Sequence, residues 1–71
     1  MNNIFGKVLV NSQELVIPES GRLTDLLHSL QLDGRYVIVE LNGEALFKDQ
    51  IASTRISPGD RLEIVRPVAG G

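Results

Sequence analysis

The chain has 71 residues, a net charge of −2 and a hydrophobic fraction of 42%, so it is a single small globular domain rather than a disordered or two-domain chain. It contains no cysteine and one histidine, which excludes disulfides, iron–sulfur clusters, thiolate metal sites and cysteine nucleophiles. The acidic balance argues against nucleic acid as a partner, because phosphate binding depends on clustered Lys and Arg.

The N-terminal residues show neither the basic start nor the apolar run of a signal peptide, and no stretch is apolar enough to cross a bilayer. We therefore expect a cytoplasmic protein with no membrane partner. The first predicted strand is Ile4–Val10, which is apolar on much of both faces and should lie inside the sheet. A turn at 11–13 and a short apolar segment at 14–17 predict an antiparallel return strand that ends at Pro18.

The helix prediction depends on four leucines spaced at i, i+3, i+4 and i+7 between Pro18 and Asp33: Leu23, Leu26, Leu27 and Leu30. This spacing places all four on one stripe of a helix, which we expect to pack on the sheet. Ser20 is the predicted N-cap, and the helix should end near Asp33 and Gly34.

The second half of the chain again has strand character. Residues 37–41 predict a strand, and Asn42-Gly43 after it predicts a tight hairpin that lets residues 45–47 pair back. Residues 48–58 predict a loop or short helical turn that carries Ile51 and Ile56 into the core. A turn at 58–60 then leads into a last strand, 61–66, in which apolar and charged residues alternate.

This order of elements predicts an α+β roll, in which one main helix packs across one face of a mixed sheet. The layout resembles the β-grasp, or ubiquitin-like, fold. We expect residues 1–66 to form that domain and residues 67–71 to form a flexible tail that ends in Gly-Gly.

Side chains offer little chemistry of their own. His28 is the only histidine and so the obvious candidate for a general base, but it lies away from the leucine stripe and is expected to be a solvated surface histidine. The acidic residues are scattered, so no pair suited to acid–base catalysis is apparent. No glycine-rich phosphate loop occurs, and we expect no cofactor or metal to be bound by this chain. The protein should not be an enzyme.

Gly70 and Gly71 differ from the other glycines because they close no turn and pack no core. A tail that carries almost no side chains, Ala69-Gly70-Gly71, can pass through a channel too narrow for other residues, and glycine lets the backbone approach a reacting phosphate closely. The Gly71 carboxylate is ionised at neutral pH and available to attack an activated phosphate. The six residues from Arg66 onward extend roughly 20 Å, enough to reach a partner's active site.

The globular body should then act as the recognition handle. Threading the tail costs about 1 to 2 kcal/mol for each backbone residue that is fixed, and contacts made by the body must offset that cost. We predict an apolar docking surface on the sheet face that the helix leaves open, with Val65, Pro67 and Val68 at its edge.

Three segments carry a family resemblance: Val-Ile-Val-Glu-Leu-Asn-Gly-Glu at 37–44, Gly-Asp-Arg-Leu-Glu-Ile-Val at 59–65 and Val-Ala-Gly-Gly at 68–71. With this element order, the chain resembles the thiamine-biosynthesis sulfur-carrier family, ThiS, over nearly its whole length. The resemblance implies that an adenylating enzyme like those that activate ubiquitin uses ATP and Mg²⁺ to convert the Gly71 carboxylate into an acyl-adenylate. Sulfur from a persulfide donor protein then displaces AMP, and the resulting thiocarboxylate supplies thiazole synthase. The carrier would be a co-substrate, and a monomer when free.

Three alternatives remain open at this point. The small subunit of molybdopterin synthase has a similar fold and Gly-Gly end, but it is usually somewhat longer with a more aromatic first strand. A ubiquitin-like modifier would join Gly71 to a lysine of a target protein. A non-catalytic interaction domain would use the same fold and have a tail without function.

Overall fold

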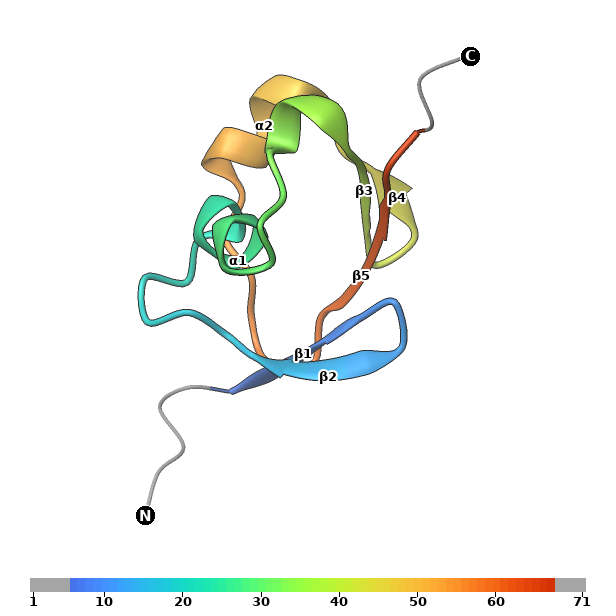
Figure 1. Ribbon diagram of the computed structural model, residues 1–71. Helices are drawn as coiled ribbons and strands as arrows, with labels where there is room; N and C mark the ends of the chain where they lie inside the picture. Colours follow the sequence, from blue (N-terminus) through green and yellow to red (C-terminus); the bar gives the residue numbers. More distant parts are fainter. Residues whose placement is uncertain (1–5, 68–71) are drawn as a thin grey trace.

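The computed structural model describes residues 6–67, which form a five-stranded sheet, two α-helices and one 3-10 helix. The strands are β1 (Lys7–Val10), β2 (Gln13–Val16), β3 (Ile38–Leu41), β4 (Glu44–Ala45) and β5 (Arg61–Val65), and the helices are α1 (Leu23–Ser29), η1 (Gly34–Tyr36) and α2 (Lys48–Ser53). Both α-helices lie on one side of the curved sheet, as Figure 1 shows. This arrangement confirms the predicted α+β roll.

The sheet has the strand order β2-β1-β5-β3-β4, so the last strand of the sequence lies in the middle. β1 pairs with β2 antiparallel and with β5 parallel, while β3 pairs antiparallel with both β5 and β4. The sheet is therefore mixed, and β1 lies inside it as predicted. β5 has a neighbour along each edge (Figure 1).

The core lies between the sheet and α1. It consists of twelve buried aliphatic side chains: Val8, Val10, Ile17, Leu23, Leu26, Leu27, Val37, Val39, Ile51, Ile56, Leu62 and Ile64. The predicted leucine stripe supplies three of them, and Leu30, the fourth leucine, is half-buried at the helix end. Ile51 and Ile56 are both buried, as expected from the segment that joins β4 to β5.

The start of α1 differs from the prediction. The N-cap is Arg22, and no side chain caps the helix there, so Ser20 is wrong as the N-cap. The Ser20 hydroxyl instead accepts a hydrogen bond from the Arg22 backbone N–H at 3.1 Å, because Ser20 lies two residues before the N-cap. Gly21, with φ +72°, takes the chain between these two residues and shifts the first helical residue to Leu23.

The Asn42-Gly43 hairpin forms as predicted, and both residues have positive φ, +51° and +88°. The returning strand is shorter than expected, because β4 ends at Ala45 and Phe47 is already the N-cap of α2. The Gln50 side chain accepts a hydrogen bond from the Phe47 N–H at 2.8 Å, which draws residue 47 into the helix start. Pairing of Phe47 in the sheet was therefore a wrong prediction.

Several strand ends also move. β1 is described from Lys7, so the predicted start at Ile4 lies outside the described residues, as does most of the predicted tail, from Val68 to Gly71. β3 begins at Ile38 and not at residue 37, and β5 ends at Val65. The leucine helix ends well before Asp33. The 3-10 helix η1, which the sequence pattern does not predict, occupies the segment from Gly34.

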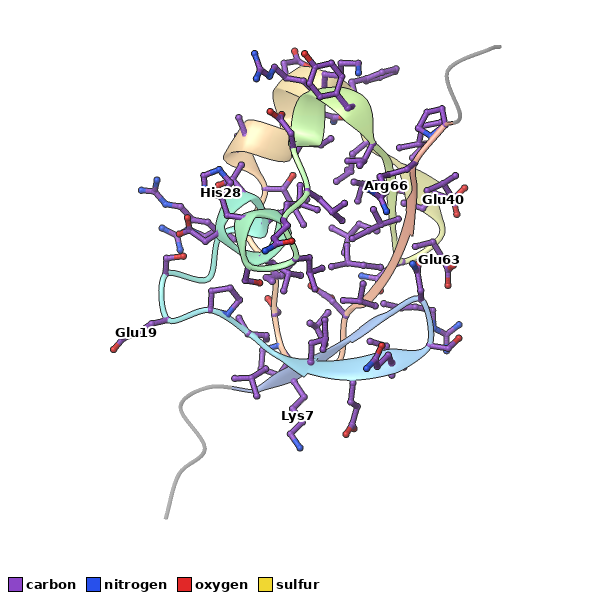
Figure 2. The ribbon with its side chains drawn as sticks, viewed as in Figure 1. Lys7, Glu19, His28, Glu40, Glu63 and Arg66 are labelled. Carbon is purple, nitrogen blue, oxygen red and sulfur yellow. The ribbon has the colours of Figure 1, made fainter. Side chains whose placement is uncertain are left out.

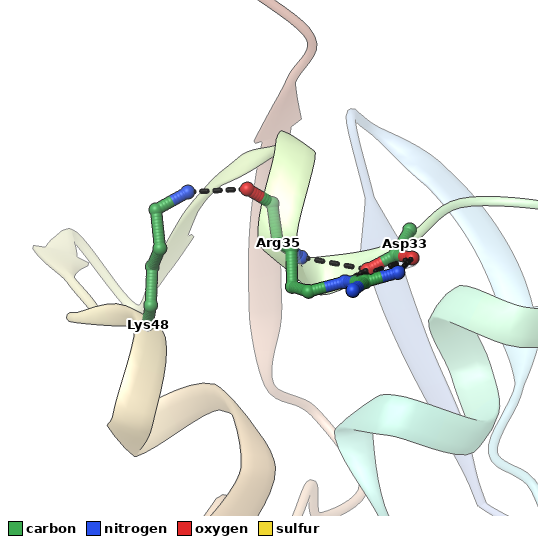
Figure 3. Close-up of polar contacts among 3 residues, drawn as sticks. All are labelled: Asp33, Arg35 and Lys48. Atoms are coloured by element: carbon green, nitrogen blue, oxygen red, sulfur yellow. Dashed lines mark hydrogen bonds and ion pairs between the residues drawn. The ribbon is translucent and has the colours of Figure 1, made fainter.

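A polar network joins η1 to α2 (Figure 3). The Asp33 carboxylate accepts hydrogen bonds from the Arg35 Nη2 at 2.8 Å and from the Arg35 backbone N–H at 2.9 Å, and Lys48 donates to the Arg35 carbonyl. The guanidinium hydrogen bond, assisted by the backbone N–H, lowers the pKa of Asp33 from its ordinary value of 3.8 to about 2. The network thereby holds the chain that leads into β3.

This network predicts a specific titration. The Asp33 carboxyl, followed by NMR, should titrate near pH 2, and in Arg35→Ala its midpoint should return toward 3.8. Because the folded-state pKa is depressed, the stabilising contribution is complete above the unfolded value and is lost as the pH falls through about 2. A wild-type midpoint near 3.8 would contradict the network.

Candidate functional site

The candidate site is the end of β5, where the folded body passes into the C-terminal residues. The direction in which the chain leaves the sheet is set by how β5 is held. The turn before it is built from Asp60, whose carboxylate accepts the Ser57 N–H at 2.8 Å, and Gly59, whose φ of +89° favours glycine. β5 then runs through the centre of the sheet.

Along one edge of β5, hydrogen bonds recur at every second residue. Leu9 N–H donates to the Asp60 carbonyl at 3.0 Å and Asn11 N–H to the Leu62 carbonyl at 2.9 Å. At Asn11 the backbone turns away from β5 with φ +48°, and beyond this point the Asn11 side-chain amide makes the hydrogen bonds to β5. The amide oxygen accepts the Ile64 N–H at 2.8 Å, and the amide nitrogen donates to the Ile64 carbonyl at 3.1 Å. Asn11 thus extends the pairing of β5 beyond the end of β1.

The other edge is held by a second asparagine. The Asn42 N–H donates to the Arg61 carbonyl at 2.8 Å, and the Asn42 side-chain oxygen accepts the Arg61 N–H at 2.9 Å. The same amide donates to Asp60 at 3.0 Å. Both asparagines lie in hairpin turns, and each adds side-chain hydrogen bonds to the one that its backbone N–H donates to β5. Asn42 holds the start of β5, and Asn11 holds the strand near its end.

The face of the sheet turned away from α1 and α2, here called the outer face, carries two pairs of directly opposed residues on β3 and β5. Ile38 lies opposite Val65 near the end of β5, and Glu40 lies opposite Glu63. All four are exposed, Ile38 by 51% and Val65 by 55%. Glu40 and Glu63 project on the same side of β5, away from α1 (Figure 2).

Arg66 follows on the opposite side of β5, and its side chain projects toward the helical layer (Figure 2). There it borders a groove of about 480 Å³ between the β1–β2 hairpin, the end of α1 and β5. The lining residues are Val10, Asn11, Gln13, Leu15, Leu30, Leu32, Ile64 and Arg66.

The sequence-predicted site residues fall into two groups. Val65 and Pro67 are exposed, and Val65 lies on the outer face as expected. Val68, Ala69, Gly70 and Gly71 lie outside the described residues. Ile38, Glu40, Glu63 and Asn11 were missed. Their alternation along the strands was visible in the sequence, but their neighbours across the sheet depend on register.

His28 is exposed in the last turn of α1 and lies away from β5 (Figure 2). Within residues 6–67, no three His, Cys, Asp or Glu side chains gather closely enough to hold a metal ion. In the same part of the chain, no helix combines the length and the apolar character needed to cross a membrane.

Comparison with known proteins matches residues 3–71 to the model of the ThiS family. A sulfur carrier protein ThiS of Bacillus subtilis is 40% identical over 53 residues, which cover 75% of this chain and 80% of that protein. A thiazole synthase of Paramagnetospirillum magneticum is 37% identical over 65 residues, which cover 92% of this chain and only 20% of that much longer protein.

The fold comparison agrees. The crystal structure of the thiamine biosynthesis protein ThiS from Geobacter metallireducens matches with a TM-score of 0.73 and 31% identity, covering 92% of this chain and 99% of that one. This likeness confirms the predicted β-grasp fold.

The Asn11 hydrogen bonds predict a stability effect. Asn11→Ala should lower the free energy of unfolding by about 1 to 3 kcal/mol, because it leaves the partly buried Ile64 N–H and carbonyl without their partner. Asn11→Gly accepts the positive φ and so separates loss of the amide from backbone strain. Chemical denaturation measures both.

Gln13→Ala is the matched control in the same hairpin, and it should stay within about 0.5 kcal/mol of wild type. If Asn11→Ala and Asn11→Gly both unfolded like the wild type, the amide would not hold β5.

Proposed function

Because the chain belongs to the ThiS family and is a sulfur carrier of thiamine biosynthesis, we propose that it carries its sulfur on the α-carboxylate of Gly71. The observation that supports this site most is the placement of β5. The strand that leads to the Gly-Gly residues is the central strand of the sheet and is held on both edges. The body can therefore present the tail in one direction.

The proposed reaction starts in an adenylating partner enzyme, which supplies ATP and Mg²⁺. A carboxylate oxygen of Gly71 attacks the α-phosphorus of ATP, pyrophosphate leaves, and an acyl-adenylate forms. A persulfide of the donor protein then attacks the carbonyl carbon, and the bond to AMP breaks. A second thiol reduces the resulting S–S bond and leaves the Gly71 thiocarboxylate. This chain contributes no catalytic side chain and no bound cofactor to these steps.

The last proposed step transfers sulfur to thiazole synthase. Support comes from the thiazole synthase of Paramagnetospirillum magneticum, in which a segment resembles 92% of this chain. Gly70 and Ala69 give the tail its narrow profile, while Val65, Pro67 and Val68 make partner contacts. We place this cycle in the cytoplasm, where ATP is available to the activating enzyme.

The alternatives differ in their support. The relatives named ThiS favour thiamine over molybdopterin biosynthesis. A protein modifier shares the activation step and would differ only in its acceptor, a lysine amine. An interaction domain with an idle tail requires no activation.

Removal of Gly71 tests the proposed site. With the cognate adenylating enzyme, the wild type should support ATP–pyrophosphate exchange, and the chain lacking Gly71 should give none. The truncation should leave the melting temperature unchanged, because no described element includes this residue. Exchange that persists without Gly71 would refute the assignment.

Gly70→Val tests access. A branched side chain next to the reacting carboxylate should lower the exchange rate at least tenfold while folding stays intact, because it widens the tail and restricts its backbone. Glu19→Val, on the exposed loop before α1, serves as the control for adding valine to the surface. Equal exchange rates for Gly70→Val and wild type would contradict the proposal that Gly70 is needed for the tail to enter the active site.

A further inference from the structure

The outer face carries two like-charged residues at directly opposed positions. Glu40 and Glu63 are cross-strand partners on β3 and β5. Directly opposed residues have Cβ atoms about 4.5 to 5.5 Å apart, and like charges at such positions destabilise a sheet. Among residues 6–67, neither carboxylate takes part in an ion pair. The two exposed carboxylates therefore lie on neighbouring strands of the same face, and neither has a cationic partner within residues 6–67.

Arg61 lies near both glutamates but pairs with neither. It precedes Glu63 by two residues on β5 and shares with both glutamates a shallow hollow of about 520 Å³. It makes no contact within ion-pair distance with either carboxylate. Even with Arg61 counted, the hollow keeps an excess of one negative charge, which suits one basic side chain from outside.

The hollow lies beside an apolar pair. Ile38 and Val65 are the neighbouring opposed pair on the same face. Val65 follows Glu63 by two residues on β5, and Ile38 precedes Glu40 by two residues on the antiparallel strand β3. An enzyme that receives Gly71 must lie close to this end, because the five residues from Pro67 to Gly71 span at most about 18 Å. The acidic pair and the apolar pair are thus the parts of the outer face nearest to such an enzyme.

We propose that the Glu40–Glu63 pair receives a lysine or arginine of thiazole synthase, while Ile38 and Val65 pack against an apolar side chain next to it. This inference rests on the proposed delivery of sulfur to thiazole synthase. A basic side chain between the two carboxylates neutralises their repulsion only in the complex. The same two glutamates then weaken the free fold and strengthen the complex.

Glu40→Gln and Glu63→Gln give opposite effects in two measurements. Each variant should raise the melting temperature of the free chain, because the repulsion is removed. Each should weaken binding of the unmodified chain to the thiazole synthase of the same organism about tenfold, measured by calorimetry, since one partner of an interfacial charge pair is lost. In the double variant the fold-loss of affinity should be smaller than the product of the two single fold-losses, because both carboxylates bind the same cation.

Glu19→Gln is the matched control. It makes the same change in net charge on an exposed loop at a distance from β3 and β5 (Figure 2). Its affinity and melting temperature should equal those of the wild type. The wild-type affinity should also fall with added salt more steeply than that of the double variant.

Unchanged affinity in both single variants would overturn the proposal, as would a wild-type chain that does not bind thiazole synthase. Weaker binding together with a lower melting temperature would also overturn it, because general damage would then explain the loss. If the variants weakened only the activating enzyme's use of the chain, the pair would belong to that interface instead. The carrier function is tested separately by pyrophosphate exchange, which does not involve thiazole synthase.

Discussion

The structure depends on the way β5 is held in the centre of the sheet. Parallel pairing with β1 and antiparallel pairing with β3 satisfy its two edges, and the side-chain amides of Asn11 and Asn42 supply hydrogen bonds where the backbone of the hairpins turns away. Buried Leu62 and Ile64 fasten its inner face to the core. A strand held in this way defines both the place and the direction in which the chain leaves the body.

Under the proposed function, this constraint lowers the cost of delivering the C-terminal residues to a partner enzyme. Ordering the tail inside an active site costs about 1 to 2 kcal/mol for each backbone residue, and a rigid base means that fewer residues need to be ordered. The remaining cost must be met by contacts of the folded body. The outer face beside β5 offers an apolar pair, Ile38 and Val65, and an uncompensated acidic pair, Glu40 and Glu63. On the proposed role of the acidic pair, replacing either glutamate should stabilise the free chain and weaken its binding to the partner.

Local patterns predicted most of the fold. Three local patterns each predict one conformation, and the structure confirms all three: the leucine spacing of α1, the Asn42-Gly43 hairpin and the alternation in β5. Features that depend on distant parts of the chain could not be predicted. Asn11 bonds to Ile64, 53 residues away, and Glu40 meets Glu63 only through the sheet register. The prediction of Ser20 as the N-cap of α1 was wrong because the positive φ of Gly21 shifts the helix start to Leu23.

Sulfur carried by the α-carboxylate of Gly71, as proposed, changes the mass of the chain terminus. Intact mass spectrometry after incubation with the cognate activating enzyme, ATP and a persulfide donor detects that change. We expect a mass gain equal to the replacement of one oxygen by sulfur, located on Gly71 by fragmentation. An unchanged terminus in the presence of a competent activating enzyme, or sulfur found on any other residue, would contradict it.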